Sequence, residues 1–140
     1  MGNLGLGVII HHLSGGAENS ADKYYGRKIK GAEFGDDKLK ITFDDGVQIS
    51  IFDGGQSCCE NRYMNTSDDV KWLVGKTLTG LTLKDAPDEN GDYDVHEVQF
   101  LEVMTDHGCI IFANHNEHNG YYGGFGMNIK EISTRESDNV

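Results

Sequence analysis

Two short stretches in the first half of the chain alternate apolar and polar residues, and this alternation restricts the fold more than any other feature. The stretches are KLKITF (38–43) and QISIF (48–52). A repeat of two residues is typical of a strand with one buried face, because successive side chains of a strand point to opposite sides. Asp45-Gly46 lies between the stretches and is a hairpin turn signal. The sequence therefore predicts antiparallel strands joined by tight turns.

A similar pattern recurs later in the chain. YGRKIKG aligns with VGKTLTG at an offset of 49, which pairs Gly26 with Gly75. Further on, Asp45-Gly46 aligns with His107-Gly108 at an offset of 62, because the insertion APDENGDYD enlarges a turn. At that offset DGGQSCCE and HNEHNGYY become equivalent loops. If a pseudo-twofold axis relates the two halves, these loops can meet.

A short segment precedes each aligned stretch. This segment opens on a serine that is closely followed by aspartate, and the serine is Ser20 in one copy and Ser67 in the other. Such residues are typical N-caps, so we expect a short helix at the start of each copy. The predicted fold is α+β, mostly antiparallel sheet with two short helices. The chain is expected to form a single domain, 1–140, with repeat halves of about 20–60 and 67–130 and a flexible tail of about 133–140.

The chain is strongly acidic, with 12 basic and 23 acidic residues and a formal net charge of -11. Such a surface repels phosphate and anionic lipid, which disfavours direct binding to nucleic acid or to membranes. An acidic domain is attracted to basic surfaces, including the channels in which other proteins hold nucleic acid. No apolar run is long enough to span a membrane, and no secretion signal begins the chain, so we expect a cytoplasmic protein.

The stretch HNEHNGYYGGF (115–125) contains two histidines, two asparagines, two tyrosines and three glycines within eleven residues. Its three glycines disfavour a helix, so His115 and His118 are expected on a loop. Three cysteines, an odd number, disfavour a disulfide framework and leave free thiols or metal ligands. Cys109 lies in the apolar segment GCIIF and is expected to be a core residue.

Thiolates and imidazoles together are the ligands that zinc prefers in structural sites. The sequence predicts such a site from Cys58 or Cys59 or both with His115 and His118, and His96 could replace one of the two adjacent cysteines. The alternative is a turn whose histidines bind backbone groups and whose cysteines fill the core.

DGGQSCCENRYM, VHEVQFLEVMTDHG and HNEHNGYYGGF together resemble a family of small proteins encoded by phages and prophages, over roughly residues 45–130. The chain is also similar to zinc-binding anti-CRISPR proteins that inhibit Cas9. This resemblance implies a metal-stabilised inhibitor, not an enzyme, that binds a Cas9-type nuclease in the host cytosol and blocks its binding of DNA. Structural zinc held by the five residues above would fit that role.

Two other functions remain open. A metal-dependent hydrolase would keep one coordination position for water and use Glu97 or Glu117 as general base. A protein that sequesters a nucleotide signal would stack Trp72, Tyr121 or Tyr122 on a base and bind phosphate through its few arginines.

Overall fold

The computed structural model describes residues 8–12, 18–55, 60–86, 89–90, 95–118 and 124–133. Within these ranges the chain forms ten strands and two 3-10 helices. The strands are β1 (Val8–His12), β2 (Ile29–Gly35), β3 (Lys38–Phe43), β4 (Val47–Asp53), β5 (Asn61–Asn65), β6 (Leu78–Asp85), β7 (Glu89–Asn90), β8 (Val95–Thr105), β9 (Gly108–His118) and β10 (Met127–Ser133). The helices are η3 (Glu18–Tyr24) and η4 (Val70–Leu73).

The α+β prediction is wrong, because the described residues contain no α-helix and the protein is nearly all-β. The two expected helices are single 3-10 segments of seven and four residues. Segments this short gain too few hydrogen bonds to offset helix nucleation. Asp69, not Ser67, caps η4, and its side chain accepts a 3.1 Å hydrogen bond from Lys71 N. Neither helix in the described ranges is long and apolar enough to span a membrane.

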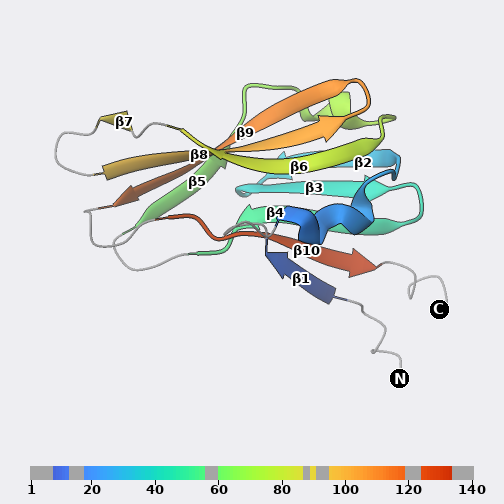
Figure 1. The fold of residues 1–140 in the computed structure, drawn as a ribbon, viewed down its shortest axis with the longest axis horizontal. Helices are drawn as coiled ribbons and strands as arrows, with labels where there is room; N and C mark the ends of the chain where they lie inside the picture. Colours follow the sequence, from blue (N-terminus) through green and yellow to red (C-terminus); the bar gives the residue numbers. More distant parts are fainter. Residues whose placement is uncertain are drawn as a thin grey trace.

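The strands form two antiparallel sheets (Figure 1). The first sheet has the order β1-β10-β4-β3-β2. The second has the order β5-β9-β8-β6, with β7 paired to β8. β5 follows β4 in the chain but joins the second sheet, and β10 follows β9 but joins the first. Each half of the chain therefore contributes one strand to the sheet of the other half.

The two sheets meet where β2 and β6 begin, through an isolated bridge between Lys28 and Thr77. These positions are themselves 49 residues apart, the offset of the sequence alignment. The backbone hydrogen bonds around the bridge occur in pairs whose members are related by the same offset of 49 residues. In one pair, Gly26 N donates to Leu78 O and Gly75 N donates to Ile29 O, each over 2.8 Å. In the other pair, Tyr25 N donates to Asp22 O and Val74 N donates to Lys71 O. The contacts at this junction thus follow a local pseudo-twofold relation.

Beyond the hairpin turns, the alignment at the offset of 62 is wrong by one residue. The first turn contains residues 44–46, whereas the second contains only 106–107. Buried Ile49 therefore corresponds to buried Ile110, and not to Ile111, which is 40% exposed. A shift of one residue moves every side chain of a strand to the opposite face.

The apolar core lies between the inner faces of the sheets. Its largest side chains include Phe43 of the first sheet and Phe112 of the second, both fully buried. Phe34 packs across the interface, with its ring centroid 5.4 Å from that of Phe112. Tyr24 of η3 donates a hydrogen bond to Glu131 of β10. Burial, and then this carboxylate, raises the pKa of Tyr24 above its ordinary value, so the phenol stays protonated and holds η3 to the sheet.

The hairpin of β8 and β9 is longer than the strands opposite it. Each of its strands has 11 residues, compared with six in β3 and seven in β4. In Figure 1 its open end, together with β5, projects past the first sheet. Here the inner face changes from apolar to polar: Leu101 and Phe112 are followed by Gln99, Asn114 and other polar side chains. This polar end contains the candidate site.

Gly26 and Gly75 occupy equivalent positions at the junction of the two sheets, so we expect their substitution to lower the stability of the protein by similar amounts. Gly26 and Gly75 have φ values of +90° and +89°, and a Cβ at either position would meet no atom within 4 Å. Gly26→Ala and Gly75→Ala should therefore each lower the free energy of unfolding by about 1–2 kcal/mol, through backbone strain alone. Gly35→Ala is the control, because that position is also open but has no positive φ. Urea unfolding measures the three values, and losses no larger than that of the control would contradict this account.

Candidate functional site

His115 and His118 lie in strand β9, not on the expected loop. The glycines that argued against a helix begin only at Gly120, after the strand has ended. Positions three apart in a strand face opposite sides of the sheet. The two imidazoles therefore belong to different clusters, one on each face of the second sheet.

The outer-face cluster is built from neighbouring positions of three strands. Tyr63 of β5 lies directly opposite His115 of β9, and their rings stack with centroids 4.5 Å apart and an interplanar angle of 8°. His96 of β8 completes the cluster, with its Nε2 2.9 Å from Nδ1 of His115. We call Tyr63, His96, His115 and Glu117 the histidine cluster.

Hydrogen bonds orient both imidazoles. Nε2 of His115 lies 3.2 Å from Oδ1 of Asn65, and its Nδ1 faces Nε2 of His96. Both ring nitrogens of His115 therefore have a hydrogen-bonding neighbour, which fixes the orientation of the ring. Tyr63 donates a 2.6 Å hydrogen bond to Oε2 of Glu117, which is 4.0 Å from Nε2 of His96. The cluster thus combines two imidazoles, a phenol and a carboxylate, with His115 9% exposed.

The separation of the two facing nitrogens of His96 and His115 is that of a hydrogen bond, 2.9 Å. Tetrahedral zinc holds imidazole nitrogens at about 2.0–2.1 Å, which separates two of them by about 3.3 Å, so a bound ion would require the rings to move apart slightly. No group of three or more His, Cys, Asp or Glu side chains suited to a metal ion occurs among the described residues. Cys58 and Cys59 lie outside them.

His118 is on the inner face, where its Nε2 lies 2.9 Å from Oε1 of Glu97. Gly124 N donates a 2.8 Å hydrogen bond to the same carboxylate oxygen. Glu97 therefore connects the end of β9 to the chain that returns towards β10. Of the histidines predicted from the sequence, the structure brings His96 and His115 together and separates His118 from both.

A buried ion network lies beside His118. Arg62 contacts Asp53 through Nη1 at 2.9 Å and Glu60 through Nη2 at 2.9 Å and Nε at 3.1 Å. The side chains of Arg62, Asp53 and Glu60 are 8%, 9% and 0% exposed. Asn116 donates 3.1 Å hydrogen bonds to Glu60 and to Gly124 O. The Arg62 guanidinium thus compensates two buried carboxylates. Asp53 belongs to β4 of the first sheet, and Glu60 directly precedes β5 of the second sheet.

The same network brings the described ends of two loops together. Gly126 N donates a 2.9 Å hydrogen bond to Asp53, and Gly54 N donates one of 2.8 Å to Gly126 O. A Cβ at Gly126 would lie 3.2 Å from Gly55 N, a tight contact, so this close approach favours glycine. Residues 54–55 and 124–126, which flank the cysteine and glycine-rich segments, therefore lie against each other.

Three amide oxygens at the polar end accept no hydrogen bond from the described residues: those of Gln99, Asn114 and Asn116. Each amide nitrogen has an acceptor, respectively Asp85, the backbone of Gln99, and Glu60, which fixes the orientation of the group. Buried acceptors without donors are costly. The described residues therefore leave three acceptor positions at this end of the sheet that water or a ligand can satisfy.

Cys109 is exposed, and the prediction that it fills the core is wrong. The inward positions of β9 are Ile110 and Phe112, and strand alternation places Cys109 outward.

Sequence reasoning missed Tyr63, Arg62, Asp53 and Glu60. Tyr63 and Arg62 lie in NRYMN, one on each face of β5, and nothing in that stretch indicates which strand pairs with it. Their proximity to the predicted histidines depends on β5 crossing to the second sheet.

A family model described as a domain of unknown function (DUF7448) matches residues 20–126. The chain belongs to this family. The DUF7448 match covers both sets of predicted ligands and all the residues of the histidine cluster and the ion network. It begins after β1 and ends just before β10. Comparisons with curated proteins and with solved structures gave no match.

The ion network predicts a large effect of Arg62→Met. Removing the cation leaves two buried carboxylates uncompensated, so the free energy of unfolding should fall by about 3–5 kcal/mol. Lys84→Met is the control, because Lys84 is 65% exposed and its pairing with Glu102 should contribute no more than about 1 kcal/mol. Urea unfolding of both variants measures the difference, and equal losses would show that the network is not stabilising.

Proposed function

We propose that this DUF7448 domain is a binding protein, not an enzyme, that docks onto a basic surface of a nucleic-acid-handling complex. Its net charge of -11 supports an electropositive partner. The observation that carries the proposal is an exposed apolar area framed by carboxylates on the outer face of the second sheet.

The apolar area consists of facing residues of β8 and β9. Phe100 pairs with Ala113, and Met104 pairs with Cys109. Met104 is 38% exposed, and Ile111, between these pairs, is 40% exposed. A hollow of about 630 Å³ adjoins the area and reaches the chain that follows β5. We call this area the apolar face.

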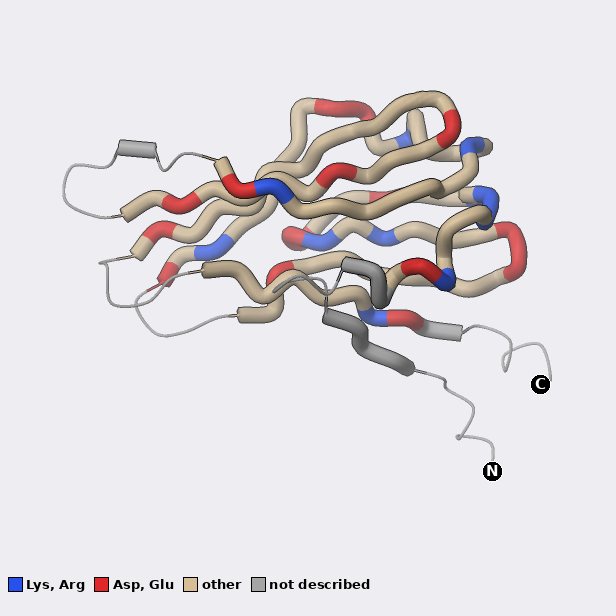
Figure 2. Tube along the Cα trace, viewed as in Figure 1, with Lys and Arg blue, Asp and Glu red and all other residues tan. Residues whose placement is uncertain are grey.

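Carboxylates surround the apolar face. Asp68 accepts a 2.9 Å hydrogen bond from Ile111 N, and Glu102 lies directly opposite Ile111 on β8. Asp106 is in the turn between the strands, where the backbone N–H of Thr77 and then His107 lower its pKa, so it is ionised at neutral pH. Figure 2 shows acidic positions at the turns of this sheet. An apolar centre with an acidic rim suits a partner surface that presents an apolar side chain among lysines and arginines.

The resemblance to anti-CRISPR proteins supports a specific partner, a Cas9-type nuclease in the cytosol of a bacterial host. The DNA channel of such a nuclease is basic because it holds the phosphate backbone. A protein docked there blocks DNA binding by occupying that surface.

This proposal predicts that the purified protein prevents DNA binding by a susceptible Cas9-type complex. The double variant Met104→Gln with Ile111→Gln should inhibit at least about tenfold less well, because it removes the apolar centre without changing the charge. Val74→Gln is the control, since Val74 is 42% exposed but lies outside β8 and β9. A gel-shift titration measures inhibition. Absence of inhibition at large molar excess across Cas9 types would refute the partner, and full activity of the double variant would refute the apolar face.

The second part of the proposal is structural zinc, with His96 and His115 as its imidazole ligands and Cys58 or Cys59 as thiolate ligands. The 2.9 Å separation of the imidazole nitrogens supports the first pair. Zinc of this kind contributes to folding, because the free energy of binding is part of the free energy of folding.

Elemental analysis of purified protein tests the zinc. We expect His115→Ala and Cys59→Ala to lose metal and to melt at lower temperature, whereas His118→Ala should keep the metal because its imidazole lies on the opposite face. Equal metal content in wild type and in all three variants would contradict the site.

One observation favours the alternative of a metal-dependent hydrolase. Glu117 lies beside the two imidazoles, 4.0 Å from Nε2 of His96, and is 41% exposed at its side chain. A carboxylate in that position can act as general base towards a bound water. Hydrolysis of phosphoester or peptide substrates by the metal-loaded protein, abolished in Glu117→Gln, would select the hydrolase.

A further inference from the structure

The outer face of the first sheet carries several lysines, whereas the protein as a whole is acidic. Strand alternation places Leu39 and Ile41 in the core and therefore directs Lys38 and Lys40 outward. Ser50 of β4 lies directly opposite Lys40, and Lys130 of β10 lies directly opposite Ser50. We call Lys38, Lys40 and Lys130, with Ser50 between the last two, the lysine face. Figure 2 shows the basic segments along β3.

The lysines of this face are not held in ion pairs by the carboxylates that the structure describes. Four basic residues are held in ion pairs by described carboxylates: Lys23, Arg27, Arg62 and Lys84. Lys38, Lys40 and Lys130 form no such pair with any described residue, even though Glu33 lies directly opposite Lys40. Because no described carboxylate holds them, the three ammonium groups are available to bind a ligand.

The spacing of these groups fits an anion. Two strand intervals separate Lys40 from Lys130 by about 10 Å at the backbone, a distance that two lysine side chains can close from both sides. Between them lies the Ser50 hydroxyl, on a residue that is 6% exposed. Both lysine side chains are long enough for their ammonium groups to reach the position of the Ser50 hydroxyl above β4. This arrangement supplies the donors that a phosphate group requires.

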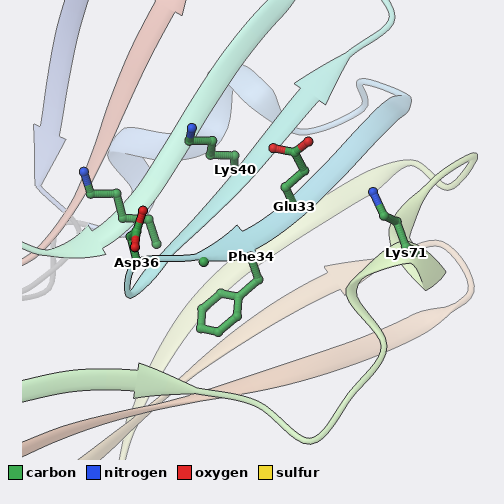
Figure 3. A pocket seen from close by; sticks show the side chains of 7 residues that line it. Glu33, Phe34, Asp36, Lys40 and Lys71 are labelled. Carbon is green, nitrogen blue, oxygen red and sulfur yellow. The ribbon is translucent and has the colours of Figure 1, made fainter.

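The lysine face continues into a hollow of about 450 Å³ at the edge strand β2. Its lining includes Lys38, Lys40 and Lys71, whose ammonium donates a 3.0 Å hydrogen bond to Ala32 O and is thereby positioned at this edge. Figure 3 shows Glu33, Lys40 and Lys71 projecting to one side of the strands and the ring of Phe34 pointing away. A volume of this size is that of a small-molecule site.

Two carboxylates, of Glu33 and Asp36, also line the hollow. They disfavour a ligand made only of phosphate, but they accept hydrogen bonds from hydroxyl or amino groups. A ligand that binds both the lysines and the two carboxylates carries phosphate at one end and hydrogen-bond donors at the other. Long nucleic acid is disfavoured, because the net charge of -11 repels an extended polyanion.

We propose that the lysine face and its adjoining hollow form a binding site for a nucleoside polyphosphate, with Lys40, Lys130 and Ser50 holding the phosphates. The site is on the opposite sheet from the apolar face and does not depend on the function proposed above. The carboxylates of Glu33 and Asp36 face the nucleoside.

Titration of the ¹⁵N-labelled full chain with adenosine triphosphate at low salt tests this site. We expect saturable shifts of backbone amide signals in β3, β4 and β10. Lys40→Gln and Lys130→Gln should each bind about tenfold more weakly, the loss typical of one charge-assisted hydrogen bond. Lys84→Gln is the matched control, because it removes the same charge from an exposed lysine on the other sheet and should bind like wild type.

Each other outcome overturns the proposal. Absence of saturable shifts at millimolar nucleotide removes the site, and equal weakening in Lys84→Gln reduces it to non-specific charge attraction. If tripolyphosphate binds as tightly as the nucleotide, the nucleoside does not contribute to binding and that part of the proposal is wrong. A single-stranded oligonucleotide that binds more tightly per phosphate assigns the lysine face to nucleic acid instead. Thermal melting of each variant, expected to match wild type, excludes unfolding as the cause of lost binding.

Discussion

The contact of Arg62 with Asp53 and Glu60 is the interaction on which the candidate site depends. Asp53 ends β4 of the first sheet, whereas Arg62 belongs to β5 of the second, so this buried ion network joins the sheets where their apolar cores have ended. It also holds the described ends of the two loops that flank the predicted ligands. Apolar packing could join two sheets at least as stably, but once the ion network is buried, loss of any one partner leaves the others uncompensated.

Strand geometry divides the functional groups of the second sheet between its two faces. His115 and Tyr63 face outward with His96, while His118 and Asn116 face inward with the ion network. The outer group combines two imidazoles, a phenol and a carboxylate, and the inner group contains the buried ion pairs. Both lie at the open end of the long hairpin, and the outer group directly adjoins the apolar face, because His115 follows Ala113 at the next outward position of β9.

The two sheets also present different surfaces to solvent. The second sheet combines exposed Met104 and Ile111 with surrounding carboxylates, which suits a basic protein partner. The first sheet presents Lys40 and Lys130 on either side of Ser50, which suits a phosphate group. The two proposals therefore place a macromolecular partner and a small anion on different sheets. Because the surfaces lie on different sheets, the two kinds of binding can be tested separately.

The sequence by itself determined the antiparallel strands, the hairpin turns, and the glycine pair Gly26 and Gly75, because residue alternation and turn chemistry are local properties. It also singled out His96 and His115, which the structure places with their ring nitrogens 2.9 Å apart. It did not determine that the helices shorten to 3-10 segments, because their stability depends on packing against the sheets. Tertiary structure alone decided which strand β5 would join, and hence which residues meet Tyr63 and Arg62. It also decided the turn length that sets the register of β9, because a change of one residue in a hairpin moves every later side chain to the other face.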